Sequence, residues 1–260
     1  MKPIKSEFIR FWSMTEAYLA MLPVAILSLV FSVINIGVIN AVLVGDLESQ
    51  QLDPSLASKP LATLLSEGYL GPVYQSAVIF IPLAVAYLAN LEYIHGDHEE
   101  AILIPGSLMA RRIGTIACMG LWSILTTLCA AIINFAVCLI LLDPAGQSQV
   151  SVVDAFAVCL RVFVFSLLFT TLALAISAIT QRLFTSIIIL IGLFMVSLAG
   201  VFMRLLPPLH NALPLIGGKS FAFYDPAQGP FSVVASFWLL IAWMIIPALV
   251  YLFVAGLRRR

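Results

Sequence analysis

The chain has 260 residues, of which 62% are hydrophobic and only 10% are charged, and its formal net charge is zero. A soluble domain of this size cannot bury so much apolar surface, so the composition excludes an ordinary soluble protein and indicates a lipid bilayer as the solvent. The zero net charge gives no reason to expect a nucleic-acid partner.

The first residues, MKPIKSEFIRFWSM, precede the first long apolar run and predict a short helix in the headgroup region of the bilayer. Its apolar side chains can share one helical face; they are Ile4, Phe8, Phe11 and Trp12. A frayed polar tail is the alternative, and aromatic residues at helical spacing argue against it.

Six apolar stretches follow that could cross the membrane as helices. About 30 Å of hydrocarbon takes roughly 20 residues at 1.5 Å each. The stretches are 18–44, 70–91, 113–142, 155–180, 183–203 and 231–257. They are too long, and alternate too little, for strands of a membrane β-barrel. We therefore predict an all-α, polytopic membrane protein with a single transmembrane domain over residues 1–260.

Two of the connections between these stretches are long. The connection 45–69 is polar, whereas 204–230 is apolar but interrupted by prolines and glycines, so it cannot span as one helix. It could dip into the bilayer as short helical pieces covered by protein, or lie on the surface as an ordered loop. Composition does not separate these two readings.

Lysines and arginines indicate the orientation of the chain. One side of the predicted spans carries Lys2, Lys5, Arg10, Arg111, Arg112, Arg182, Arg258, Arg259 and Arg260, and the other carries Lys59, Arg204 and Lys219. By the positive-inside rule, both termini and the connection 91–112 are predicted to be cytoplasmic. The expected location is a bacterial plasma membrane.

Arg161 lies about two turns into the fourth predicted span, where a charged side chain is costly. We expect it to face the bundle interior, a cavity or a partner subunit, with Asn134 and Asp154 as candidate neighbours. The equally weighted alternative is that its side chain snorkels to the outer interface.

The connection 91–112, LEYIHGDHEEAILIPGSLMARR, is the polar interruption with the clearest pattern. His95 and His98 could hold a metal with nearby carboxylates, but a glycine between them breaks the helix, and a solvated polar helix is favoured. Glu99 and Glu100 are similar to the paired glutamates of intramembrane CAAX-type proteases, yet the arginine those enzymes place a few residues later is absent. We predict neither a metal site nor a catalytic residue.

The same connection resembles the first cytoplasmic loop of ABC transporter type-2 permeases. The matching features are Glu92, Gly96, a short amphipathic helix over 97–104, Pro105 and the basic pair Arg111-Arg112. The interfacial start with Glu7, Arg10 and Ser13, and the tight turn at 176–182, agree with the same family. The resemblance extends over the order of all six predicted spans.

This resemblance implies that the connection contains a coupling helix, which docks on a separate nucleotide-binding ATPase. The implied docking residues are Glu92, Gly96, Asp97, Glu99, Glu100, Ala101, Ile102, Leu103, Ile104 and Pro105. It also implies a second permease, identical or related, and two ATPase subunits. ATP and Mg would bind those partners, and this chain would need no cofactor and catalyse no reaction itself.

The implied activity is export of an amphipathic or hydrophobic substrate, such as a drug, an antibiotic peptide or a lipid. Intramembrane polar residues that could contact it are Asn35, Tyr87, Asn90, Asn134, Arg161 and Ser197. Two other classes remain open. One is a membrane assembly factor whose loop recruits a soluble partner, and the other is an intramembrane metal-dependent hydrolase.

Overall fold

The computed structural model describes residues 2–48, 51–94 and 107–257, and within these ranges every regular element is a helix. Five helical stretches are long and apolar enough to cross a membrane: Thr15–Val44, Leu61–Ile94, Leu108–Leu141, Val152–Thr180 and Val233–Val254. Within these ranges the all-α prediction is therefore confirmed, and the five long apolar helices are consistent with a polytopic membrane protein.

The helices fall into long and short ones. The N-terminal part consists of α1 (Lys2–Ser13), α2 (Thr15–Leu19), α3 (Leu22–Val44), the 3₁₀ turn η1 (Pro54–Ser58) and α4 (Leu61–Ile94). The middle part consists of α6 (Ser107–Leu141), α7 (Pro144–Gln147), α8 (Val152–Thr180) and α9 (Leu183–Leu198). The C-terminal part consists of α10 (Val201–Leu205), α11 (Pro207–Ala212), α12 (Pro214–Gly217), α13 (Lys219–Phe223), η2 (Pro226–Gln228) and α14 (Val233–Leu257).

The fifth predicted span is shorter than the sequence indicated. The stretch 183–203 was expected to form one helix, but α9 ends at Leu198 and has 16 residues. Gly200 follows with φ of +62°, a left-handed conformation that favours glycine and ends helices. The described residues thus contain five helices of spanning length and one shorter apolar helix.

The second membrane-spanning helix begins earlier in the chain than predicted. The sequence placed its start at residue 70, whereas α4 starts at Leu61. Leu64, Leu65 and Tyr69 are buried, so this first part of α4 packs like the rest of the helix. Glu67 made the stretch look like a loop, but its carboxylate lies at the surface, 3.0 Å from Nζ of Lys59.

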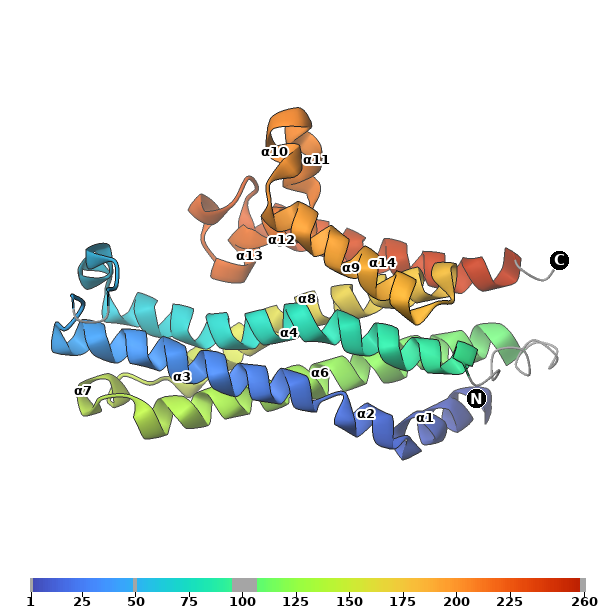
Figure 1. The fold of residues 1–260 in the computed structure, drawn as a ribbon, viewed down its shortest axis with the longest axis horizontal. Coiled ribbons are helices and arrows are strands. Elements are labelled where there is room, and N and C mark those ends of the chain that lie inside the picture. Colours follow the sequence, from blue (N-terminus) through green and yellow to red (C-terminus); the bar gives the residue numbers. More distant parts are fainter. Residues whose placement is uncertain (1, 49–50, 95–106, 258–260) are drawn as a thin grey trace.

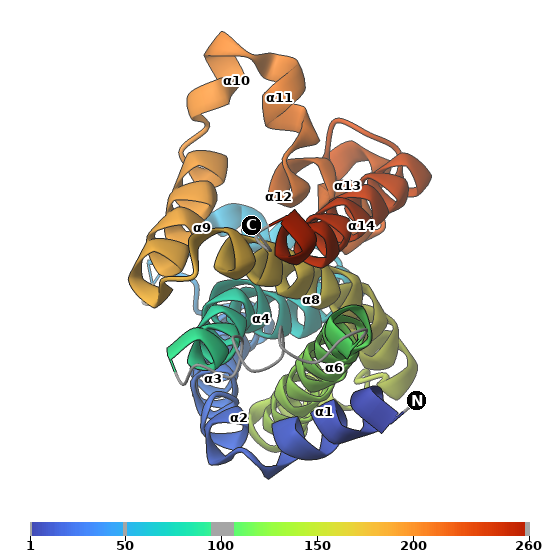
Figure 2. The same cartoon turned by 90° about the vertical axis from the view of Figure 1, so that its right-hand side faces the viewer.

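Helix α8 occupies the centre of the molecule. Viewed along the bundle, it lies between α3, α4 and α6 on one side and α9 and α14 on the other (Figure 2). Of the long apolar helices it is the most buried, with Phe165, Leu168 and Phe169 fully enclosed. Phe165 packs edge-on against Tyr74 of α4, and Phe169 against Phe194 of α9. Helix α8 therefore joins the two halves of the bundle.

The two ends of the bundle differ in structure. One end holds α1, the end of α4, the start of α6 and the end of α14 (Figure 1). The other end holds η1, α7 and the start of α8, near the succession of short helices α10–α13 that leads from α9 to α14 (Figure 1). The interrupted segment 204–230 thus does form short helical pieces.

Buried hydroxyl groups join α6 to α8. Ser123 and Thr170 lie 2.6 Å apart, and one turn further along Thr127 and Ser166 lie 2.7 Å apart. Each of these four hydroxyl groups also lies within hydrogen-bond distance of a carbonyl of its own helix, so in each pair one hydroxyl donates to the other and the second donates to a carbonyl. Small hydroxyl side chains allow close helix approach and leave no polar atom unpaired in an apolar interior.

Asn134 of α6 compensates for a proline in α4. Pro72 lacks the backbone N–H that would bond the carbonyl of Gly68, four residues earlier. The side-chain amide of Asn134 donates to the carbonyls of Gly68 and Tyr69, at 3.2 Å each, and its own oxygen accepts from Ser32 of α3 at 2.7 Å. Asn134 therefore links three helices at the position where α4 loses a hydrogen bond.

This contact gives a prediction for stability. Replacing Asn134 with Ala should lower the free energy of unfolding by about 1–2 kcal/mol, because a buried carbonyl loses its donor. In a Pro72→Ala background the restored backbone N–H should bond Gly68, and the cost of Asn134→Ala should become smaller. Reversible SDS unfolding in mixed micelles measures both values. Equal costs in the two backgrounds would contradict this role of Asn134.

Candidate functional site

Four charged side chains from three helices meet at the end of the bundle that holds both chain ends. Glu7 and Arg10 come from α1, Glu92 from the end of α4, and Arg111 from the start of α6. These ends of α4 and α6 border residues 95–106, which lie outside the described part of the chain. We call these four residues the ionic cluster.

In the ionic cluster, the two carboxylates form ion pairs with the two guanidinium groups. Arg10 contacts Glu7 at 2.5 Å and also bonds Glu92, while Arg111 lies 3.3 Å from Glu7 and 3.9 Å from Glu92. The hydroxyl group of Thr115 adds a hydrogen bond to Glu7 at 3.3 Å. Each carboxylate thus meets both guanidinium groups, so two negative and two positive charges compensate each other.

Burial makes these pairs stronger than ordinary surface ion pairs. The side chain of Glu7 is 4% exposed and that of Glu92 is 13% exposed, so neither carboxylate is well solvated. Burial on its own lowers the pKa of Arg10, but the hydrogen bond to Glu7 and the charges of Glu92 and Glu7 outweigh it and raise this pKa above its ordinary value. Arg10 is therefore charged at every pH at which the protein can be studied.

The position of α1 depends on this cluster. The sequence predicted that Phe8 and Phe11 would share one apolar face, but Phe11 is buried in the bundle and Phe8 is 45% exposed. Glu7 lies one turn before Phe11 and is buried with it, so the inward face of α1 pairs a charge with an aromatic ring. Phe8 and Ile9 remain outside, where an interfacial helix would meet lipid.

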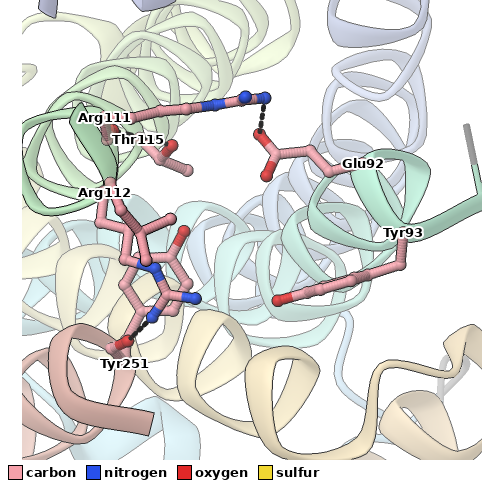
Figure 3. A pocket seen from close by; sticks show the side chains of 7 residues that line it. Glu92, Tyr93, Arg111, Arg112, Thr115 and Tyr251 are labelled. Carbon is pink, nitrogen blue, oxygen red and sulfur yellow. Dashed lines mark hydrogen bonds and ion pairs between the residues drawn. The ribbon is translucent and has the colours of Figure 1, made fainter. Parts of the chain in front are cut away.

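A small pocket opens beside the ionic cluster. It is lined by Glu92, Tyr93, Leu108, Arg111, Arg112, Thr115 and Tyr251 (Figure 3). Arg112 donates to the backbone carbonyl of Tyr251, and its guanidinium lies 5.0 Å from the centre of the Tyr251 ring. In the sequence, Arg111 and Arg112 stood out only as markers of orientation and as the basic pair of a family pattern, and no pattern pointed to Tyr251.

The predicted docking residues are described only in part. Glu92 belongs to the ionic cluster, where it bonds Arg10. The other nine, Gly96, Asp97, Glu99, Glu100, Ala101, Ile102, Leu103, Ile104 and Pro105, lie outside the described residues. Docking of an ATPase at this connection stays a prediction.

The predicted substrate-path residues lie in several places rather than around one cavity. None of the six lines the pocket beside the ionic cluster. Asn90 is fully buried and donates to Ser177 of α8 and Ser186 of α9, at 3.1 and 3.3 Å. Asn35 lies so close to α4 that a Cβ atom on Gly71 would be 2.7 Å from its amide nitrogen. Both side chains pack between helices.

The remaining path residues also have local explanations. The hydroxyl group of Ser197 donates to the carbonyl of Leu193 in its own helix, at 2.8 Å. Tyr87 is 38% exposed on α4, and Asn134 bonds the carbonyls near Pro72. Whether any of these residues contacts a substrate stays a prediction.

The direct contacts of Arg161 are with α13 and the residue after it rather than with the residues proposed on sequence grounds. Its guanidinium donates to the carbonyl of Ala222 in α13 at 3.0 Å and lies 5.5 Å from the centre of the Tyr224 ring. Of the two predicted neighbours, Asp154 is near enough to interact with Arg161 electrostatically, but neither Asp154 nor Asn134 forms a hydrogen bond or ion pair with it among the described residues. Arg161 therefore holds the short helices before α14 against α8.

Metal chemistry has no candidate in the part of the chain that the structure covers, because no three His, Cys, Asp or Glu side chains gather there. His95, His98, Glu99 and Glu100 lie outside that part. The two carboxylates of the ionic cluster are already paired with arginines, so these ion pairs link helices α1, α4 and α6 to one another.

Comparison with known proteins adds no assignment: no protein-family model matches the chain, and no match is found among curated proteins. The functional conclusion therefore depends on the sequence pattern and on the geometry of the bundle.

The ionic cluster gives a second prediction for stability. Replacing Glu92 with Gln should lower the free energy of unfolding by about 1–3 kcal/mol, since a largely buried, charge-assisted bond to Arg10 is lost. In a double-mutant cycle with Arg10→Gln, the two costs should be less than additive. Reversible SDS unfolding provides the four free energies.

The pair Lys59 and Glu67 at the opposite end of the bundle is a matched control. Both side chains are more than a third exposed, so Glu67→Gln should cost less than about 1 kcal/mol. Strict additivity of Glu92→Gln and Arg10→Gln would show that the ionic cluster does not act as a unit.

Proposed function

We propose that the chain is the membrane-spanning permease subunit of an ATP-driven exporter. In this proposal both termini and the connection 91–112 face the cytoplasm, and α9 completes a set of six membrane-crossing helices. A separate ATPase binds ATP and Mg and docks at the connection. A second permease, identical or related, completes the transporter.

The ionic cluster is the observation that carries this proposal. When an ATPase subunit closes on ATP, it can move the helices of a membrane partner only if the contact between the two subunits is rigid. The ionic cluster joins α1, the end of α4 and the start of α6, and the last two border the connection 95–106. A force on that connection would therefore move three helices together.

The distribution of positive charge supports the proposed orientation. Arg10, Arg111 and Arg112 lie at the end with the ionic cluster, and Arg182 lies in the turn between α8 and α9 at the same end (Figure 1). The opposite end has Lys59 beside η1 and Lys219 in α13. An excess of arginine and lysine on one side is the usual mark of the cytoplasmic face.

The packing of α4 and α8 indicates how such a movement would spread. Helix α4 continues from Glu92 through the bundle and packs against α8 along much of its length (Figure 1). Helix α8 in turn contacts α14 and, through Arg161, the short helices at the opposite end.

The cargo we propose is amphipathic or hydrophobic, because a path between such apolar helices offers few charged partners.

The proposal predicts co-purification and coupling. An ATP-binding subunit encoded with this chain should co-purify with it from a membrane extract, and Leu103→Asp in the connection should abolish this. Glu92→Gln should keep the complex together but reduce substrate-stimulated ATPase activity by about tenfold, equivalent to 1.4 kcal/mol of lost coupling. Pull-down and phosphate-release assays in proteoliposomes measure these effects.

Leu209→Asp is the control for the docking change, because Leu209 is exposed on α11, one of the short helices between α9 and α14. It should leave co-purification intact. An intact complex with Leu103→Asp, or full stimulation of the ATPase with Glu92→Gln, would count against the permease. An assembly factor would bind a soluble partner without any effect of ATP on substrate distribution.

A further inference from the structure

Helix α14 is attached to its neighbours by hydrogen bonds on both sides of a proline. In its first part, the indole N–H of Trp243 donates to the carbonyl of Ala212 in α11, at 2.7 Å. In its last part, Tyr251 accepts a hydrogen bond at its backbone carbonyl from Arg112 of α6, whose guanidinium lies 5.0 Å from the centre of the tyrosine ring. Pro247 lies inside the helix between these two attachments. The two parts of α14 are therefore fixed to different helices.

Pro247 weakens the backbone of α14 between the two attachments. It lacks the N–H that would bond the carbonyl of Trp243, four residues earlier, and its ring crowds that carbonyl. In the described part of the chain, no side chain takes over as donor to this carbonyl, whereas Asn134 does so where Pro72 interrupts α4. The interruption in α14 is thus left without the repair that α4 receives.

Packing does little to stiffen α14 at this proline. Helix α4 contains a second proline, Pro82, but 56% of the residues in its most apolar stretch are buried, against only 17% in α14. Ile245, Ile246 and Leu249, which surround Pro247 in the chain, are all exposed on the outside of the bundle. Few neighbouring side chains would therefore resist a bend in α14 at Pro247.

The side on which the proline lies gives the direction of such a bend. Pro247 and Tyr251 are both buried and lie one turn apart, so they share the face of α14 that is turned toward the bundle. A proline ring pushes apart the turns on its own side, and the helix bends away from that side. The last part of α14 would therefore tilt away from the bundle, and the hydrogen bond from Arg112 opposes this movement.

The attachment at Tyr251 is also connected to the ionic cluster. Arg112 follows Arg111 of the cluster directly in α6, and Figure 3 shows both beside Tyr251 and Thr115. The side chain of Thr115 hydrogen-bonds Tyr251 and also donates to Glu7 of the ionic cluster at 3.3 Å. A displacement of the start of α6 would therefore act on the end of α14 and on the ionic cluster together.

We propose that Pro247 is a hinge in α14 and that Arg112 is the latch that holds the last part of this helix against α6. The structure shows the latched state. In the released state residues 248–257 tilt away from α6, while the first part of α14 stays attached to α11 through Trp243. The hinge does not depend on the transport function. In the proposed exporter, a displacement of the connection 95–106 would reach the latch through α6.

Hydrogen–deuterium exchange of the purified full chain in neutral detergent, read by mass spectrometry, tests the latch. Arg112→Gln should speed amide exchange in residues 248–257 at least about tenfold, because the loss of a charge-assisted hydrogen bond favours local opening. Exchange in residues 233–243 should not change. Unchanged exchange in 248–257, or equal acceleration in both segments, would overturn the proposal.

The hinge is tested by restoring the missing donor. Pro247→Ala supplies an N–H for the carbonyl of Trp243, so α14 should become continuous and stiffer. In this background Arg112→Gln should speed exchange in residues 248–257 by less than about threefold. If the acceleration remains tenfold without the proline, Pro247 is not the hinge.

Trp243→Phe is the matched control, because it keeps an aromatic ring and removes the hydrogen bond to Ala212 on the other side of the proline. It should speed exchange in residues 209–213 and leave 248–257 unchanged. Acceleration of 248–257 as large as that caused by Arg112→Gln would contradict separate attachment of the two parts of α14.

Should Arg112→Gln fail to fold, Tyr251→Phe decides the question. It removes the contact between the tyrosine hydroxyl group and Thr115 and leaves the backbone carbonyl in place. Exchange in residues 248–257 should then rise by about threefold, with 233–243 unchanged. No rise would overturn the proposal. Because every measurement uses this chain alone, failure to find an ATPase partner leaves these outcomes unaffected.

Discussion

Hydrocarbon offers no hydrogen-bond partner, so each polar group that a membrane helix carries inward has to be satisfied by another part of the chain. The bundle is organised around this constraint. Asn134 supplies the donor that Pro72 removes, and the paired hydroxyl groups of Ser123 with Thr170 and Thr127 with Ser166 bond each other and their own helices. These contacts lie on α4, α6 and α8, the helices that form the centre of the molecule.

The same constraint explains where charge is tolerated. Glu7, Arg10, Glu92 and Arg111 are placed where the long helices end, and they compensate each other there. Arg161 lies inside the apolar helix α8 rather than at its end. It is accommodated there because Ala222 provides a carbonyl and Tyr224 an aromatic face. The cost of each charge is therefore offset by a contact that also fixes one helix against another.

Hydropathy was sufficient to predict most of the helices, because a run of twenty apolar residues has few alternatives to a membrane helix. It failed where the boundary depends on a few residues. The early start of α4 was hidden by Glu67, whose charge lies at the surface of an otherwise buried turn, and the end of α9 depends on the left-handed backbone of Gly200.

The candidate site was predictable only in fragments. Glu7 and Arg10 were visible in the interfacial helix, and Glu92 in the charged connection, but Arg10 and Glu92 are 82 residues apart in the chain. Arg112 and Tyr251 are 139 residues apart, and their hydrogen bond involves a backbone carbonyl, which no side-chain pattern reveals. The partner of Arg161 was missed for the same reason, since it is the carbonyl of Ala222.

The early end of α9 has a consequence for the surrounding lipid. Its 16 residues cover about 24 Å along the helix axis, whereas the 25 residues of α14 cover about 37 Å. The two helices therefore present unequal hydrophobic heights on the same side of α8. In the proposed arrangement, with α9 as a sixth membrane-crossing helix, lipid tails beside α9 would shorten or tilt, at a cost of fractions of a kcal/mol per Å of mismatch. The bilayer would thus be locally thinned on one flank of the protein, next to the point where α10 begins.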